Sequence, residues 1–278
     1  MSELHKKLSC VPVSFFKDII SGNMSFYELA LFCKKQGLSA VDLGVTLLGD
    51  RKETSLIDIR NQVEEAGVTI AGIMAYPDFT NPEEKKRINE IDNLERDLEA
   101  ASTLGAKFVR ITAGQSHKGL RRERGISLAV NGILEAISLS KHYNMRLLYE
   151  HHAKPSVWEY PDFNLPTDIF LEIFGAIKNS DIGVLFDTAN PLVYGDDPFT
   201  ILNVVYDRVE CVHISDIKTK GKQEMVVIGT GIVPILDIML FLQKNKYDGW
   251  ISIEEASFTG IEGFEQAISF VRENWKQI

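Results

Sequence analysis

Short apolar segments recur along the whole chain, and a longer segment with helical periodicity follows each of them. The short segments are rich in β-branched side chains, as buried strands are. They lie at residues 8–14, 40–45, 68–75, 106–112, 145–150, 182–187, 209–214 and 250–254. The longer segments place apolar residues at the spacing of an amphipathic helix. Eight strands that alternate with eight helices, at about 35 residues per unit, predict a parallel sheet.

Two of the helical segments carry clear end signals. Residues 25–37 begin with Ser25, a residue type that caps helix N-termini, and end with Gly37. Residues 81–105 have Pro82 at a first-turn position and acidic residues directly behind it, which favour a helix start. Both segments are therefore predicted to be helices of this alternating pattern.

The number of units favours a closed (β/α)₈ barrel, a TIM barrel, that forms one domain over residues 1–278. The length of 278 residues suits one such barrel, and nothing in the chain marks a linker. A doubly wound open sheet is the main alternative. It would need a ligand crevice where the strand order reverses, and the Gly-rich fingerprint of dinucleotide binding is missing after the first strand. We therefore expect the barrel.

Composition and charge narrow the partners of this barrel. The 45% of hydrophobic residues is ordinary for a globular protein, and a net charge of −9 disfavours nucleic acid and anionic membranes. The beginning of the chain has no apolar run typical of a secretion signal, and no later run reaches the length of a membrane span. Three cysteines at unrelated spacings indicate neither a disulfide framework nor a zinc site built from thiolates. We expect a cytoplasmic protein that acts on small molecules.

The last four predicted strands all end in titratable residues. Their ends read "LLYEHH", "VLFDTAN", "CVHISD" and "SIEEAS". The C-terminal ends of barrel strands face one shared mouth, so Glu150, Asp187, His213 and Glu254 are expected to converge there. Three carboxylates packed together repel one another and need a cation to stay ionised. The pattern predicts a metal site.

Side-chain alternation along the strands sharpens this assignment only in part. If Glu150 points to the barrel axis, so does His152, whereas His151 points toward the helices. His152 is therefore the better substrate contact. At the last strand, alternation leaves Glu254 and Glu255 as equal alternatives, because either one places an acid inside the barrel.

These strand ends resemble the xylose-isomerase-like barrels, which include ketose 3-epimerases, hydroxypyruvate isomerase, inosose dehydratase and apurinic endonucleases. The resemblance spans nearly the whole chain and is strongest from 145 to 255. In the family, a Gly-x-Gly turn and a helix lead to an aromatic-x-Gly step with a Glu five residues after that Gly. Here Gly249 leads to Glu254, so the resemblance selects Glu254 over Glu255. It implies a divalent metal held by Glu150, Asp187, His213 and Glu254, with Glu150 and Glu254 also acting as the catalytic acid and base.

One departure from the family pattern bears on the substrate. The epimerases and endonucleases show Asp-x-x-His after the sixth strand, whereas this chain has Asp187 followed by Asn190. The nucleases use that histidine for an additional metal and draw further histidines from earlier strands, which this chain lacks. A multi-metal nuclease is therefore the last-ranked function. Asn190 can keep a hydrogen bond to a substrate oxygen, but it cannot exchange protons.

The resemblance and the donor set together favour a sugar isomerase or epimerase. Three carboxylates and an imidazole suit Mn²⁺, which we favour, as well as Zn²⁺, Mg²⁺ or Co²⁺. Such a metal would hold a substrate carbonyl and its neighbouring hydroxyl and stabilise the enediolate that forms when the intervening C–H is lost. The expected substrate is a small ketose, a sugar phosphate or a related polyol ketone. His152, Asn190 and Lys218 are candidates to bind its hydroxyls. Arg110 is a weaker candidate, which either faces the mouth or pairs with an acid.

Two rival functions remain at this stage. A lyase would use the same enediolate to expel water, as in inosose dehydratase. A non-catalytic barrel would bind a sugar and keep the metal for structure. The resemblance also implies a homo-oligomer, because family members often form dimers or tetramers. The connection at residues 153–166, with three prolines and three aromatic residues, is either a lid over the mouth or a packed surface excursion.

Overall fold

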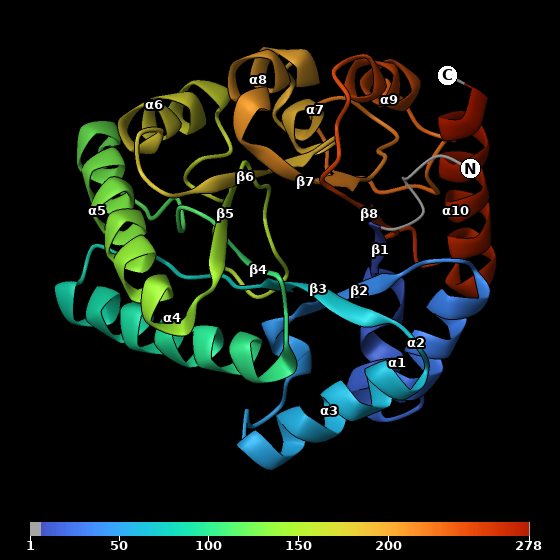
Figure 1. The fold of residues 1–278 in the computed structure, drawn as a ribbon. Helices are drawn as coiled ribbons and strands as arrows, with labels where there is room; N and C mark the ends of the chain where they lie inside the picture. The colour runs from blue at the N-terminus through green and yellow to red at the C-terminus, as the bar shows by residue number, and fades with distance from the viewer. Residues whose placement is uncertain (1–6, 278) are drawn as a thin grey trace.

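The computed structural model describes residues 7–277 and shows a closed barrel of parallel strands surrounded by helices (Figure 1). The strands pair in chain order, and β8 pairs with β1 to close the sheet. They are β1 (Leu8–Val11), β2 (Ala40–Gly44), β3 (Thr69–Met74), β4 (Phe108–Ile111), β5 (Arg146–Glu150), β6 (Gly183–Asp187), β7 (Val209–Ile214) and β8 (Trp250–Glu254). The predicted (β/α)₈ barrel is confirmed. The start of the chain, where we expected no secretion signal, lies outside the described residues.

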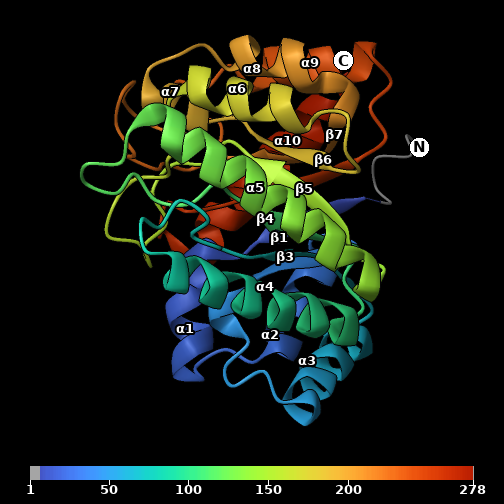
Figure 2. The same cartoon turned by 90° about the vertical axis from the view of Figure 1, so that its left-hand side faces the viewer.

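The outer layer follows the predicted alternation, with short additional helices in two of the units (Figure 2). The α-helices are α1 (Phe16–Ser21), α2 (Phe26–Lys35), α3 (Glu53–Glu65), α4 (Glu84–Leu104), α5 (Arg122–Ser140), α6 (Thr167–Ile177), α7 (Asn190–Tyr194), α8 (Pro198–Val205), α9 (Ile235–Lys244) and α10 (Gly260–Gln277). The short helices α1 and α7 precede the longer α2 and α8 in the units that follow β1 and β6. Within residues 7–277, none of these helices is both long and apolar enough to cross a membrane.

Local sequence signals explain several element boundaries. Ser25 accepts a hydrogen bond from the backbone N–H of Glu28, whose side chain accepts one from the Ser25 backbone, so a capping box starts α2 as predicted. The start of α4 differs from the prediction. Its N-cap is Glu83, so Pro82 precedes the helix instead of lying in its first turn. Strand β1 ends at Val11, earlier than predicted, because Pro12 follows and the chain turns into a 3₁₀ helix.

The apolar core has two layers. The larger one lies between the sheet and the helices, and the smaller one fills the barrel interior around Met74, Phe108 and Leu148. Gly72 of β3 makes room for this interior layer, because a Cβ atom there would lie 2.4 Å from the Phe108 ring. The interior is thus packed with side chains, as barrel interiors are, and a site has room only where the strands end.

Strand register brings the predicted site residues together. Asp187 pairs with His213 in the β6–β7 register, so these side chains leave the sheet at the same level. Glu254 pairs with Val11 in the β8–β1 register that closes the barrel. The sheet thus places residues that are far apart in sequence at one rim of the barrel.

Candidate metal and active site

Three of the predicted metal ligands form a buried cluster at the C-terminal mouth of the barrel. Glu150, Asp187 and His213 each offer a ligand atom, and these atoms lie within 4.8 Å of one another. The side chains are almost fully buried, with exposed fractions of 1%, 4% and 1%. A buried group of two carboxylates and an imidazole is costly without a balancing charge. The cluster is therefore a candidate metal centre.

Glu254, the fourth predicted ligand, contacts this cluster through His213. Nδ1 of His213 lies within hydrogen-bond distance of Oε2 of Glu254, at 2.7 Å, and Oε1 of Glu150 lies 4.0 Å from the same nitrogen. The Glu254 side chain is 25% exposed, so it is the member of the set that reaches toward solvent. Nδ1 of His213 thus faces both glutamates.

The neighbouring Glu255 lies outside the cluster. It is fully buried, and its carboxylate accepts hydrogen bonds from the Ser14 hydroxyl and from the backbone N–H of Ser257. Alternation along β8 did not choose between the two acids. The structure places Glu254 at the cluster. The hydrogen bonds of Glu255 instead connect the β8–α10 loop to Ser14, in the 3₁₀ helix after β1.

Asp187 is fixed by three hydrogen bonds at the end of β6. Its Oδ1 accepts from the backbone N–H groups of Ala189 and Asn190 at 2.8 and 2.6 Å, and its Oδ2 accepts from the Ser215 hydroxyl at 2.8 Å. Carboxylate oxygens with such partners hold one orientation, which a metal ligand requires.

Arg110 forms an ion pair with Glu150 inside the mouth. Its Nε lies 2.9 Å from Oε2 of Glu150, although the angles are not those of a hydrogen bond. A second guanidinium nitrogen donates to the carbonyl of Ala75, and the Tyr76 ring lies 4.4 Å from the guanidinium carbon. Of the two positions considered for Arg110, pairing with an acid is the one observed. A direct substrate contact by Arg110 stays a prediction.

The electrostatics of the cluster fit a bound cation. Burial raises the pKa of Glu150 to about 8 despite the opposing charge of Arg110, and burial raises the pKa of Asp187 to about 6. Oε2 of Glu150 faces Arg110, so Oε1 of Glu150 and Nδ1 of His213, 4.0 Å apart, are the atoms that face the shared centre. A divalent ion would balance the carboxylate charges, and the oxygen and nitrogen donors suit Mn²⁺ or Zn²⁺.

Comparison with known proteins identifies the family. The model of the family described as xylose isomerase-like TIM barrel matches residues 31–274. The chain belongs to the xylose isomerase-like TIM barrel family. The resemblance seen in the sequence is confirmed.

Individual relatives of this family are distant. An inosose dehydratase of Clostridium beijerinckii is 27% identical over 143 residues, which is 46% of this chain and 46% of that relative, so less than half of the relative is matched. The crystal structure of the IolI protein with a bound zinc atom has a TM-score of 0.79 at 17% identity and covers 98% of both chains. The 3-keto-D-glucoside 4-epimerase YcjR from E. coli has a TM-score of 0.76 at 14% identity over 96% of this chain and 99% of that one. At these identities the two structures are evidence for the fold alone.

The two histidines after β5 in this xylose isomerase-like barrel point in different directions. The Nδ1 of His152 lies 2.8 Å from the carbonyl of Ala153, so it carries the proton, and Nε2 keeps its lone pair. Burial and the charge of Arg110 lower the pKa of His152 to about 3, which keeps the ring neutral. His151 donates instead to the carbonyl of Leu165 on the helix side, as alternation predicted.

The remaining predicted substrate contacts are less tightly placed. Asn190 is half-buried at the start of α7, and its side chain donates to the carbonyl of His151 at 3.1 Å. Lys218 is exposed in the loop after β7, where its backbone N–H donates to the carbonyl of Glu224. Substrate binding by Asn190, Lys218 and His152 stays a prediction.

Sequence reasoning missed Asn164, which clamps the end of β5. Its amide nitrogen donates to the carbonyl of Glu150 at 2.7 Å and to the Tyr149 hydroxyl at 3.0 Å. Its amide oxygen accepts from the backbone N–H of His152 at 3.2 Å. Asn164 is fully buried. No local pattern marked it, because its partners are 12 to 15 residues earlier in the chain.

The Gly-x-Gly turn after β7 serves the loop architecture. Gly229 has a φ of +91°, and a Cβ atom on Gly231 would lie 2.2 Å from Oδ1 of Asp216. The Asp216 carboxylate accepts from the backbone N–H groups of both glycines, at 3.0 and 2.8 Å. The glycines therefore allow the loop to wrap around Asp216.

The connection at residues 153–166 is packed in this structure. Trp158 and Phe163 are 8% and 5% exposed. The side-chain oxygen of Gln115 accepts from the backbone N–H groups of Glu159 and Tyr160 at 3.0 and 3.1 Å. These contacts favour the packed surface excursion over a free lid.

Proposed function

We propose that this protein is a divalent-metal-dependent isomerase or epimerase of a ketose, a sugar phosphate or a related polyol ketone. The observation that carries the proposal is the convergence of Glu150, Asp187 and His213 within 4.8 Å, with Glu254 in contact with His213. Carboxylates from three different strands meet at the one rim where family members can differ in chemistry.

Glu150, Asp187, His213 and Glu254 would hold the metal. When bound, the cation would act as a Lewis acid at a substrate carbonyl. We favour Mn²⁺ in the cell, with Zn²⁺, Mg²⁺ and Co²⁺ as alternatives. Asp187 is the ligand with a purely structural task, because backbone N–H groups and Ser215 already fix both of its oxygens.

Glu150 and Glu254 would transfer the proton at carbon. Burial gives Glu150 a raised pKa, whereas His213 holds the pKa of Glu254 below its usual value against the opposing effect of burial. Two carboxyl groups whose pKa values are pushed apart can serve as acid and base at one pH. Glu254 would accept the proton, and Glu150 would return one to the other face.

His152 would position the substrate beside these groups. Its Nε2 lone pair can accept a hydrogen bond from a hydroxyl, and its low pKa keeps it from competing for the transferred proton. Asn190, Lys218 and Arg110 are proposed as further contacts with substrate oxygens. We also propose that the protein forms a homo-oligomer, as many family members do.

A lyase is the second candidate, and the match to inosose dehydratase favours it. If the substrate carries a hydroxyl on the carbon next to the enediolate, the same acid and base can expel water. Proton abstraction is common to both reactions, so the residues above have the same tasks up to that point.

The experiment that tests the proposal follows deuterium. The Mn²⁺-loaded protein is incubated in D₂O with a panel of ketoses, sugar phosphates and inososes, and NMR detects deuterium at carbon. Incorporation at one carbon without loss of water supports the epimerase or isomerase, and loss of water with a new absorbing enone supports the lyase. If metal raises the melting temperature and no panel member exchanges, the non-catalytic sugar-binding barrel is favoured.

A further inference from the structure

A second polar cavity opens beside the barrel mouth. This side pocket has a volume of about 420 Å³ and is lined by residues that include Thr46, Arg51, Tyr76, Glu90, Asp97 and Trp158. Its walls come from the segments after β2, β3, β4 and β5 and from α4. All of these segments except α4 leave the C-terminal ends of strands, so the pocket lies on the face that carries the candidate metal centre.

An aromatic wall separates the side pocket from that centre. The Tyr76 ring lies 5.9 Å from the His152 ring and 6.3 Å from the Trp158 ring, centroid to centroid, and Arg110 stacks on it at 4.4 Å. Tyr76 and Trp158 also line the side pocket. The Tyr76 ring therefore borders both His152 and the side pocket.

One buried carboxylate of the side pocket has an oxygen without a hydrogen bond. Asp97 is only 6% exposed; its Oδ1 pairs with Arg51 at 2.7 Å, whereas its Oδ2 accepts no hydrogen bond from the described residues. Arg51 has a φ of +54°, which residues with a side chain rarely adopt. A buried carboxylate oxygen of this kind is stabilised by a donor from a ligand.

The other hydrogen-bond acceptors of the side pocket differ in how many hydrogen bonds they already accept from the protein. Asp78 already accepts from Gln115 and His117, among others, so it is part of the framework. Glu90 accepts one backbone N–H through Oε2, at 3.2 Å, and its second oxygen is left for a ligand. Asn93 adds an amide to the lining. The groups that remain available are mostly hydrogen-bond acceptors.

This lining selects the chemical class of the ligand. A phosphate would meet three carboxylates and one guanidinium, and that guanidinium is already paired with Asp97. An apolar group would leave the buried carboxylates without donors. An uncharged group with many hydroxyls can donate to Glu90 and Asp97 and rest its C–H surface on the aromatic wall.

We propose that the side pocket binds an uncharged sugar unit attached to the reacting keto-sugar, so that the substrate is a glycoside or disaccharide. The identity of the reacting part rests on the function proposed above. The side pocket then supplies binding for a part of the substrate that does not react, and this is a means by which an enzyme selects among substrates with the same reactive group.

Equilibrium binding to the Mn²⁺-loaded protein tests the proposal with probes that carry no keto group, and NMR checks that the protein does not convert them. Calorimetry compares D-glucose, cellobiose, maltose and D-glucose 6-phosphate. At least one of the two disaccharides is expected to bind tenfold or more tightly than glucose, and the phosphate is expected to add nothing. Disaccharides that bind no better than glucose, or tightest binding by the phosphate, would overturn the proposal.

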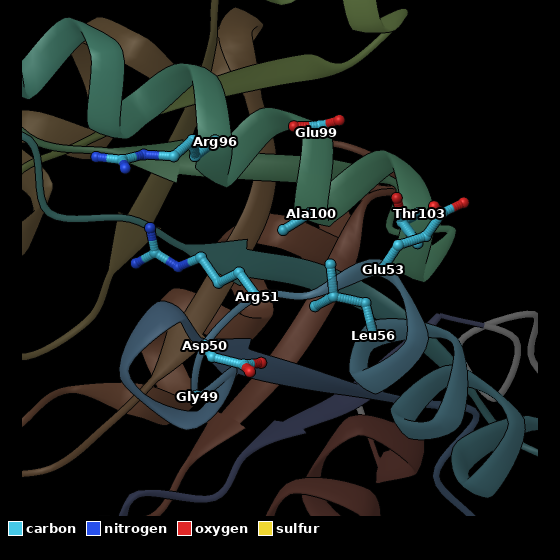
Figure 3. A pocket seen from close by; sticks show the side chains of 9 residues that line it. All are labelled: Gly49, Asp50, Arg51, Glu53, Leu56, Arg96, Glu99, Ala100 and Thr103. Atoms are coloured by element: carbon cyan, nitrogen blue, oxygen red, sulfur yellow. The ribbon is translucent and has the colours of Figure 1, made fainter.

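Two variants and a matched control locate the preference. Asn93→Leu and Glu90→Gln are expected to lower the affinity for the disaccharide at least fivefold and to leave the affinity for glucose unchanged. Glu99→Gln is the control, because Glu99 lies on the same helix but lines an outer groove between the β2–α3 segment and α4 (Figure 3). A preference that survives both pocket variants, or that Glu99→Gln also removes, would place the second sugar elsewhere and overturn the proposal.

This test is separate from the test of the reaction. The probes carry no keto group, so a preference for disaccharides that both pocket variants remove supports the side pocket even if no keto-sugar exchanges deuterium. Deuterium exchange without any preference for a disaccharide would support the proposed reaction and contradict sugar binding in the side pocket.

Discussion

The two halves of the barrel rim carry different chemistry. Strands β5 to β8 end in Glu150, Asp187, His213 and Glu254, which converge on one candidate metal centre. Strands β2 to β4 lead into Tyr76 and the side pocket, and β4 itself carries Arg110. The ion pair between Arg110 and Glu150 joins the two halves.

This difference indicates a division of tasks. The second half holds candidate ligands, most of them buried, whose positions follow from strand register, and reaction chemistry needs such fixed geometry. The first half contributes loops and a cavity, which can change between relatives without displacing a ligand. Distinct reactions among xylose isomerase-like barrels are then compatible with one metal centre. The predictions below alter one half at a time.

The largest effect is expected for the acids of the second half. Glu150→Gln and Glu254→Gln should each lower deuterium exchange at least about 1000-fold, because each removes a group that we propose transfers the proton. NMR in D₂O measures the rate. Glu255→Gln is the matched control and should stay within about threefold of wild type, since Glu255 bonds to Ser14 and Ser257 outside the cluster. Wild-type exchange in both variants would show that the catalytic assignment is wrong.

The next largest effect is expected on stability, when the ion pair between Arg110 and Glu150 that joins the two halves is removed. Arg110→Met should lower the free energy of unfolding by about 3 kcal/mol at pH 9, because Glu150, with a pKa of about 8, is mostly ionised there and loses its buried partner. Urea denaturation measures this. Arg122→Met is the control: Arg122 pairs with Asp168 and Glu172 but is 40% exposed, so about 1 kcal/mol or less is expected. Equal losses in the two variants would contradict the special role of the Arg110 pair.

A pH effect of intermediate size is expected in the metal-free protein. The folded pKa of Glu150, about 8, lies above its unfolded value, so the folded state holds a proton that the unfolded state has lost. Stability should therefore fall by up to about 2 kcal/mol as pH rises from 6.5 to 8. His213, also with a raised pKa, changes stability in the same direction. His151 and His152, with lowered pKa values, act in the opposite direction, but mostly below pH 6.5; within this window each adds only about 0.4 kcal/mol.

Thermal unfolding with and without Mn²⁺ measures this pH effect. Added metal should stabilise the protein more at pH 8 than at pH 6.5, because it binds the ionised carboxylates. Stability that rises between pH 6.5 and 8 without metal would contradict the raised pKa of Glu150.

The smallest expected effect is on the affinity for Mn²⁺ when one hydrogen bond to Asp187 is removed. Ser215→Ala removes the hydroxyl that donates to Oδ2 of Asp187 and should weaken Mn²⁺ binding about fivefold, or about 1 kcal/mol. Calorimetric titration with Mn²⁺ measures the affinity. Ser140→Ala is the control, since its hydroxyl bonds within α5, and it should leave the affinity unchanged. The same affinity in Ser215→Ala and wild type would mean that Asp187 needs no support from Ser215.

The fold was largely predictable because strand and helix periods are local properties of the chain. The eight strands lie where the apolar runs predicted them, and the main errors are at boundaries. Pro12 ended β1 early, and Glu83 rather than Pro82 defines the start of α4. Such boundaries depend on one or two residues whose preferences compete.

The candidate site was predictable to the extent that it follows strand ends. Closure of the barrel brings Glu150, Asp187 and His213 together, and alternation gave the opposite directions of His151 and His152. Side-chain partners between distant segments were not predictable, because alternation gives a face and not a neighbour. The Arg110–Glu150 pair, the Asn164 clamp and the side pocket are of this kind.

One measurement tests the shared metal centre most directly. Crystals grown with Mn²⁺ and measured near the manganese absorption edge give the position of the ion. We expect one strong anomalous peak at the mouth, about 2.0–2.3 Å from donor atoms of Glu150, Asp187, His213 and Glu254. A saturating Mn²⁺ concentration that gives no peak there, or a peak only in the side pocket near Glu90 and Asp97, would contradict the shared metal centre.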